Sequence, residues 1–289
     1  MIYPDGQAFL TARTKRVMLF GMSGLGKTTL SNMLRDQARW FHYSVDYRIG
    51  TRYMGEYISD NFKREAMKVP LLRELLMSDS VYITSNITFD NLAPLSTYLG
   101  KPGDTAKGGL PFAEYQRRQA QHGQAEVAAM LDTTRFIERA HDLYGYNHFV
   151  CDTSGSICEV VDGDNPADPV LTEVAAHLLP VWIKGSDAHR EELCRRFDRA
   201  PKPMYYRPEF LLQVWGEYLA QTGLSAESAD PDAFLRFGYA RLLESRQPRY
   251  AAMARWGVTV TAEEVAAVTT PAGFDTLIAR ALDRRISAT

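Results

Sequence analysis

Eight consecutive residues near the start of the sequence have the types and the spacing needed to bind phosphate. They read Gly21-Met-Ser-Gly-Leu-Gly-Lys-Thr28 and fit the pattern G-x-x-x-x-G-K-[ST] at every defined position. The glycines let backbone N–H groups turn toward phosphate oxygens. Lys27, which we expect to be an exposed loop residue, would neutralise the β and γ oxygens. Thr28 would offer its hydroxyl to Mg²⁺. The segment predicts a site for a nucleoside triphosphate with magnesium. The residues expected to contact the nucleotide are Gly21, Ser23, Gly24, Leu25, Gly26, Lys27, Thr28 and Thr29.

The sequence on either side of this loop predicts the elements that the loop requires. A short apolar run at 17–20 precedes it, and apolar residues at helical spacing follow it as far as Ala38. Further short runs that are apolar or β-branched predict strands, and helical patterns separate them. This alternation favours an α/β fold with a mostly parallel, doubly wound sheet of about five to six strands, covered by helices on both faces. The further predicted strands are 42–46, 81–85, 148–152, 180–184 and 258–262.

We expect residues 1–289 to form a single nucleotide-binding domain. Cap signals support helices in the second half of the chain: Thr261 with Glu264 forms a capping box, and Asp230 and Thr270 each precede a proline. Two regions do not fit a minimal alternation of strands and helices, and we interpret them as helical insertions. The expected core comprises 14–86, 147–203 and 250–289, and the insertions are approximately 87–146 and 204–249.

Two aspartates are candidates for the acidic group that holds the water shell of the metal. Asp152 ends an apolar run and leads into small residues that would allow close approach by a ligand. Asp46 ends the strand predicted after the helix of the phosphate loop. Either aspartate could instead cap a helix or a turn. We expect Thr28 and Asp152 to hold the metal, while the choice between the two aspartates stays open at this point.

Arginines near these aspartates suggest how a second substrate could be bound. Arg48 and Arg52 follow Asp46 and could meet a carboxylate or phosphate with bidentate geometry, or they could be solvated surface charges. A later helix carries Arg195, Arg196 and Arg199, which could close over the transferred group or interact with the end of their own helix. The residues expected beside a second substrate are Arg48, Arg52, Thr153, Ser154 and Gly155.

The order of these parts resembles the small-molecule P-loop kinases of the shikimate, gluconate and nucleoside-monophosphate type. The matching stretches, about half of the chain, are GMSGLGKTTL, the strand ending in Asp46, HFVCDTSGS, WIKGSDAHREELCRRFDRAP and VTVTAEEV. The resemblance implies a P-loop NTPase core, ATP and Mg²⁺ as cofactors, and transfer of the γ-phosphate to a small-molecule acceptor. It places Asp46 near the metal and the acceptor, residues 153–156 beside the acceptor, and the three arginines of the later helix in a lid.

The match departs from the shikimate kinases at two positions. Those enzymes have paired aspartates where this chain has Ser44-Val45-Asp46, and three glycines where it has Ser154-Gly155-Ser156. These differences argue against shikimate itself as the acceptor.

Two other functions are weighed against a kinase. The segment Asp152-Thr-Ser-Gly155 also satisfies the D-x-x-G pattern of GTPases, but the guanine-reading N-K-x-D is missing, because the nearest candidate is Ile183-Lys184-Gly185-Ser186. An ATPase that primes water with a glutamate after the strand is disfavoured because Thr153 follows Asp152. A regulatory ATPase that passes a conformational change to a protein partner stays as the alternative.

Composition restricts the partners and the location. The sequence has 33 Lys+Arg against 35 Asp+Glu and a net charge of −2, so it lacks the basic surface of a general nucleic-acid binder. No apolar run approaches the ~20 residues that cross a bilayer. The first residues lack the order of a signal peptide, and the three cysteines match no zinc pattern. We therefore expect a cytoplasmic protein with no membrane partner. A kinase that acts on a larger acceptor, protein or nucleic acid, stays open as a further alternative, and the balanced charge disfavours nucleic acid.

Overall fold

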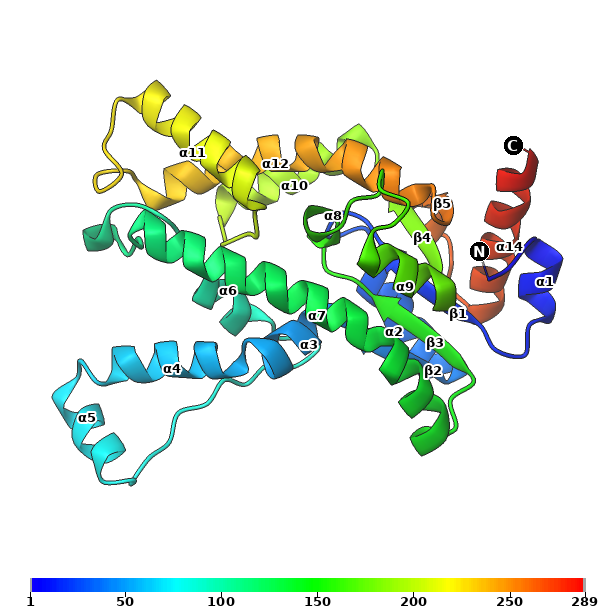
Figure 1. The fold of residues 1–289 in the computed structure, drawn as a ribbon, viewed down its shortest axis with the longest axis horizontal. Helices are drawn as coiled ribbons and strands as arrows, with labels where there is room; N and C mark the ends of the chain where they lie inside the picture. The colour runs from blue at the N-terminus through cyan, green and yellow to red at the C-terminus, as the bar shows by residue number, and fades with distance from the viewer. Residues whose placement is uncertain (1, 288–289) are drawn as a thin grey trace. The chain divides into compact units, whose positions relative to one another are not determined.

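The computed structural model describes residues 2–287, which form two compact units (Figure 1). The first, which we name the sheet unit, comprises residues 2–45, 127–200 and 238–287. The second, the helical unit, comprises residues 46–126 and 201–237. The helical unit thus includes residues 46–86, which the sequence analysis assigned to the core. The expected single domain with insertions stays a prediction.

The sheet unit is built on five strands, all paired in parallel, in the order β2-β3-β1-β4-β5. The predicted α/β fold with a parallel sheet is confirmed. The apolar side chains of the central strand are fully buried, because helices cover both faces of a sheet of this kind. The strands are β1 (Arg16–Phe20), β2 (Trp40–Ser44), β3 (His148–Asp152), β4 (Leu179–Lys184) and β5 (Val258–Thr261).

Helices of the sheet unit begin and end largely where capping chemistry predicts. Thr261 forms the expected capping box with Glu264, and the backbone N–H of Gly273 donates to Thr270 at 3.1 Å. Helices α1 and α14 are tied together where the N–H of Gly6 donates to Asp283 at 2.9 Å. These helices are α1 (Gly6–Thr11), α2 (Lys27–Ala38), α8 (Ile157–Val160), α9 (Pro169–His177), α10 (Asp187–Arg199), α13 (Ala262–Ala266) and α14 (Pro271–Ser287).

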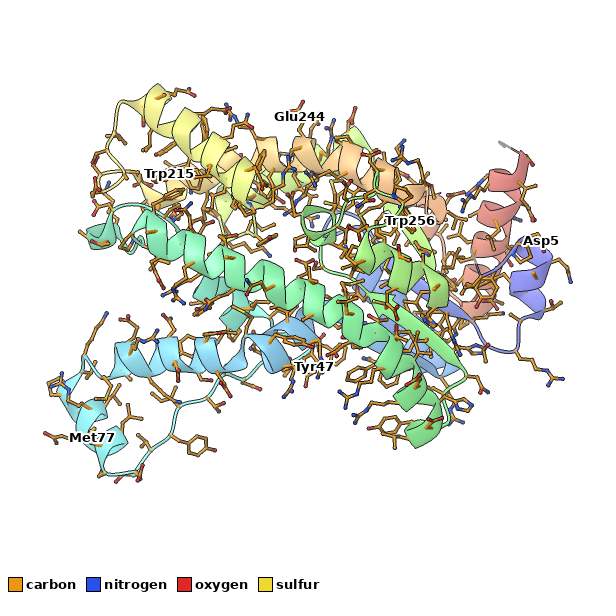
Figure 2. All side chains as sticks on the ribbon, viewed as in Figure 1. Asp5, Tyr47, Met77, Trp215, Glu244 and Trp256 are labelled. Atoms are coloured by element: carbon orange, nitrogen blue, oxygen red, sulfur yellow. The ribbon has the colours of Figure 1, made fainter. Side chains whose placement is uncertain are left out.

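The helical unit has its own aromatic core, which includes Trp215, labelled in Figure 2. The ring of Trp215 stacks on Phe112 with centroids 4.7 Å apart, and it meets the ring of Phe234 edge-on at 4.8 Å. The elements of this unit are η1 (Ile49–Tyr53), α4 (Gly55–Ala66), α5 (Pro70–Met77), α6 (Ala93–Leu99), η2 (Thr105–Lys107) and α11 (Pro208–Thr222). Three helices have residues in both units: α3 (Val45–Arg48), α7 (Phe112–Tyr144) and α12 (Pro231–Ala254).

Two strand predictions require correction. Residues 81–85 form no strand; Tyr82 is 86% exposed, so this segment lacks the buried face that would fix it in a sheet. Strand β2 ends at Ser44, and Asp46 lies in the first turn of α3 instead of at the strand end. Ser44 is the last residue of β2 and pairs with Asp152 of β3, and α3 begins at the next residue. Within residues 2–287 no helix is long and apolar enough to span a bilayer.

His148 makes the stability of the sheet unit depend on pH. Its Nδ1 accepts a hydrogen bond from the backbone N–H of Lys15 at 3.0 Å, a contact that needs an unprotonated nitrogen. Burial, and after it the charge of Lys15, lower the pKa of His148 below its ordinary 6.5, against the opposing charge of Asp275. Because the unfolded chain binds the proton more readily, this contribution to stability is present above pH 6.5 and is lost as the pH falls through the lowered pKa.

We therefore predict that the free energy of unfolding decreases between about pH 7.5 and pH 5.5 more steeply in the native chain than in His148→Asn. Asparagine keeps an acceptor near the position of Nδ1 but does not titrate. Because His148 is only partly buried, solvent screens its charge, and the difference between the two chains should stay below about 1 kcal/mol. Urea unfolding at both pH values measures it, and parallel pH profiles for the two chains would contradict the assignment.

Candidate nucleotide-binding site

The loop between β1 and α2 has the backbone conformation that its glycines predict. Gly21, Gly24 and Gly26 all have positive φ, at 139°, 80° and 92°, a region that residues with a side chain rarely adopt. A Cβ on Gly21 would lie 2.5 Å from the carbonyl oxygen of Ile183 on β4. The loop therefore packs directly against the sheet. Position 21 requires glycine both because its φ is positive and because a Cβ would have no room.

Lys27 is the first residue of α2, and its ammonium group lies within the loop. It donates to the carbonyl oxygens of Gly21 and Met22, each at 2.9 Å. The side chain is only 6% exposed, so the expectation of an exposed loop lysine is wrong. The reason is that the loop curves back over the helix terminus and surrounds the ammonium group. A positive charge and the N-terminal end of α2 thus occupy one small region, which favours anions.

Thr28 and Asp152 meet at the end of the sheet. The hydroxyl of Thr28 donates to Oδ2 of Asp152 at 2.7 Å, and Asp152 is buried at the last position of β3. Because β1 and β3 are neighbours, with Leu19 in register with Asp152, the carboxylate emerges beside the loop. Oxygen donors of this kind are the ligands that Mg²⁺ prefers, usually with one or two carboxylates and the phosphates of a nucleotide. The pair therefore fits a magnesium ion, and the binding of the metal by these two residues stays a prediction.

His42 is a neighbour of this pair that sequence reasoning missed. Its Nε2 lies 3.5 Å from Oδ2 of Asp152, and the imidazole is buried on β2. Strand β2 pairs with β3 in register, which brings His42 to the level of Val150 and its side chain toward the carboxylate. The signal was a histidine inside a predicted strand, but the neighbouring strand could not be known from the sequence alone.

The small residues after Asp152 pack against the phosphate loop. Thr153 is bound to β1, because its hydroxyl donates to the carbonyl of Leu19 at 3.0 Å. A Cβ on Gly155 would lie 2.5 Å from Oγ of Ser23, so the glycine permits this close approach. Ser154 is buried and accepts from the N–H of Ser156 at 3.3 Å. Residues 153–156, which we name the phosphate turn, thus lie beside the loop, and their expected contact with an acceptor stays a prediction.

The arginine-rich helix α10 presents other side chains to the loop. A Cβ on Gly24 would lie 3.4 Å from Leu193, and His189, one turn earlier, lines a pocket beside the loop. Both Arg195 and Arg196 pair with Glu192 of the same helix, at 2.6 and 2.7 Å, and their side chains are about two-thirds exposed. The hydrogen bond from Arg196 lowers the pKa of Glu192.

Arg199 ends α10 and is exposed, as are Arg195 and Arg196. Arg195 is about 200° around the helix from Leu193, whereas Arg196 is about 60° from it. Of these two, Arg196 is the better placed to reach toward the loop. A lid function for any of the three arginines stays a prediction.

A pocket of about 520 Å³ adjoins the loop on the side of β5. Its walls are mostly apolar, which suits the flat ring of a nucleobase more than a phosphate. The helix α13 and the segment that follows it form one wall, and α2 forms another. The lining residues are Gly24, Leu25, Gly26, Thr29, Leu30, Met33, His189, Ala262, Val265, Ala266, Val268 and Thr269.

The remaining predicted residues lie in the helical unit. Asp46 is in the first turn of α3, and Arg48 ends that helix with its guanidinium 5.6 Å from the ring of Tyr53. Arg52 is exposed within η1. Their roles toward an acceptor stay predictions.

Comparison with solved structures finds a likeness to the crystal structure of shikimate kinase from Bacteroides thetaiotaomicron. The two chains are 16% identical over 95% of this chain and 98% of the kinase, with a TM-score of 0.36. No protein-family model matches the chain, and no curated protein matches it. A likeness of this size supports no assignment of activity, so the function proposed below rests on the loop, Lys27 and the pair of Thr28 and Asp152.

Proposed function

We propose that the chain binds a nucleoside triphosphate with Mg²⁺ on the loop and transfers the γ-phosphate of ATP to a small-molecule acceptor. The observation that supports this most is the 2.7 Å contact between Thr28 and Asp152 beside the buried ammonium of Lys27. Lys27 thus supplies a positive charge that suits phosphates. Thr28 and Asp152 supply, close to it in the chain and the sheet, two oxygen atoms that suit a metal ion. Among residues 2–287 no group of three or more His, Cys, Asp or Glu could hold a metal alone, which fits an ion that arrives with its nucleotide.

In this proposal each group of the site has one task. The loop N–H groups and Lys27 bind the β- and γ-phosphates and stabilise the charge that spreads over the transferred group. Thr28 and Asp152 would hold the metal, which would supply positive charge to the phosphates of the nucleotide. The apolar pocket along α13 receives the base. The contacts of Asp152 with Thr28 and His42 hold its carboxylate in place before the nucleotide arrives.

We infer that Asp46 positions or deprotonates the acceptor hydroxyl, as the family resemblance implies. We predict that Asp46→Asn lowers acceptor phosphorylation by at least about 100-fold, because general-base catalysis contributes about 100- to 10,000-fold. Affinity for ATP should change little, since Asp46 is assigned to the acceptor. Acceptor phosphorylation and binding of a fluorescent ATP analogue are measured side by side, and an unchanged rate would remove Asp46 from the mechanism.

The alternative function is a regulatory ATPase that signals to a protein partner. One observation favours it: Gly155 of the phosphate turn contacts the loop and is also bound by α12, a helix with residues in both units. Such a protein would hydrolyse ATP slowly and without an acceptor.

Turnover of ATP by the purified chain with Mg²⁺, with and without a pooled extract of small metabolites, separates the two functions. Strong stimulation by the extract supports the kinase and allows the acceptor to be traced by fractionation. Slow turnover that ignores the extract supports the regulatory ATPase. If ATP neither binds nor turns over, both functions are wrong.

A further inference from the structure

Two side chains of α12 bind the same backbone atom of the phosphate turn. The Nη1 of Arg246 and the hydroxyl of Tyr250 both donate to the carbonyl oxygen of Gly155, at 2.9 and 2.5 Å. The two residues are one helical turn apart and almost completely buried, at 2% and 0% exposure. Both side chains therefore bind the carbonyl oxygen of Gly155. The Cα of the same residue lies against Ser23 of the phosphate loop.

The guanidinium of Arg246 is also held by a buried acid. Its Nε donates to Oε1 of Glu159 at 2.9 Å, and the two side chains are 3% and 0% exposed. Burial alone would lower the pKa of Arg246, but Tyr250 and Glu159 outweigh it and keep the guanidinium charged. A buried ion pair costs desolvation energy that its attraction barely offsets, so its presence here is poorly explained by stability. We instead attribute the ion pair to orientation of the guanidinium toward the carbonyl of Gly155.

Further contacts from the same turn of α12 reach the same region. Arg249 donates to the carbonyl of Cys158 at 3.0 Å, and Gln247 donates to Sδ of Met22 in the phosphate loop at 3.1 Å. Pro248 lies within this turn and lacks an N–H, so the helix has one backbone hydrogen bond fewer here. Side-chain contacts to the phosphate turn and to the loop therefore hold this part of α12 in place.

We propose that Arg246 and Tyr250 are positioning residues for phosphoryl transfer. By fixing the carbonyl of Gly155 they hold the phosphate turn against Ser23, and so set the orientation of backbone dipoles where the terminal phosphate is bound. Preorganised dipoles act mainly on the transition state, so their loss affects the rate more than the affinity for the nucleotide. This inference rests on the proposed function, because it says that residues outside the loop affect the rate of phosphoryl transfer at the proposed site.

The test compares Tyr250→Phe and Arg246→Lys with the controls Tyr239→Phe and Arg241→Gln. Tyr250→Phe removes one hydroxyl and keeps the ring. Tyr239 is a buried tyrosine of the same helix, stacked on Phe197 at 3.7 Å, and Arg241 is an exposed arginine of α12. For each chain, kcat and KM for Mg-ATP, the Kd of a fluorescent ATP analogue and the Tm are measured.

We expect kcat to fall at least about 10-fold in Tyr250→Phe and in Arg246→Lys, with the Kd changed less than about 3-fold. Both controls should retain the native kcat. A native kcat in folded Tyr250→Phe overturns the inference, as does a loss confined to Kd or to Tm. If Arg246→Lys fails to fold, Tyr250→Phe decides alone. Absence of ATP binding and turnover in the native chain would instead refute the proposed function itself.

Discussion

Lys27→Ala is expected to lower ATP turnover by about 100- to 1,000-fold, the loss seen when one preorganised donor is removed from a transition state. The ammonium of Lys27 lies within the loop, 2.9 Å from two of its carbonyl oxygens, so its removal takes a positive charge out of the loop itself. The variant also leaves buried carbonyls with fewer donors, which costs about 1–3 kcal/mol of stability. This cost is smaller than the 5–15 kcal/mol of a typical domain, so the chain should still fold.

Two variants make the measurement specific. Lys184→Ala removes an exposed lysine at the end of β4 and should leave turnover unchanged. Lys27→Arg keeps the charge but places a planar group where a compact one fits, and it should recover little activity. Thermal unfolding monitors the fold. Turnover within about 3-fold of the native rate in folded Lys27→Ala would show that the loop is not the phosphate site.

Thr28→Val and Asp152→Asn are expected to lower Mg²⁺-dependent turnover by at least about 100-fold. Valine has the shape of threonine without the hydroxyl, and asparagine has the shape of aspartate without the charge. Thr28→Val removes the hydroxyl, and Asp152→Asn removes the negative charge, from the pair that meets at 2.7 Å and that we propose holds the metal. The Mg²⁺ concentration that gives half-maximal turnover should rise in both variants, which a titration with Mg²⁺ at fixed ATP measures.

Thr28→Ser is the matched control, because it keeps the hydroxyl and loses only the methyl group. It should retain turnover within about 10-fold of the native chain. If Thr28→Val and Thr28→Ser behave alike, the hydroxyl is not a metal ligand and the contact with Asp152 serves the fold. If Asp152→Asn keeps the native dependence on Mg²⁺, another acidic group holds the metal, and Asp46 becomes the first candidate.

Features encoded by neighbouring residues could be predicted from the sequence. The phosphate loop depends on eight consecutive residues, and its glycines adopt the positive φ values that the pattern implies. Four predicted strands, at 17–20, 148–152, 180–184 and 258–262, match β1, β3, β4 and β5 to within one residue at each end. The capping box at Thr261 follows from side chains three residues apart.

Features made by distant parts of the chain could not be predicted. The contact of Arg246 with Gly155 joins residues 91 apart, and nothing local to either marks it. His42 meets Asp152 only because β2 and β3 are neighbours in the sheet. Residues 81–85 have the composition of a strand, but a strand also needs a partner edge and a buried face, which the sequence of one segment does not reveal.

The strand order has a consequence for synthesis of the chain. Strands β1 and β2 leave the ribosome first, yet they are not neighbours, because β3 lies between them. Their shared partner begins only at His148, after residues 46–126 of the helical unit. Until then two hydrophobic strands have unpaired edges, which exposes the nascent chain to aggregation. The phosphate loop is thus among the first parts to be made, but Asp152, the partner of Thr28, arrives more than 100 residues later.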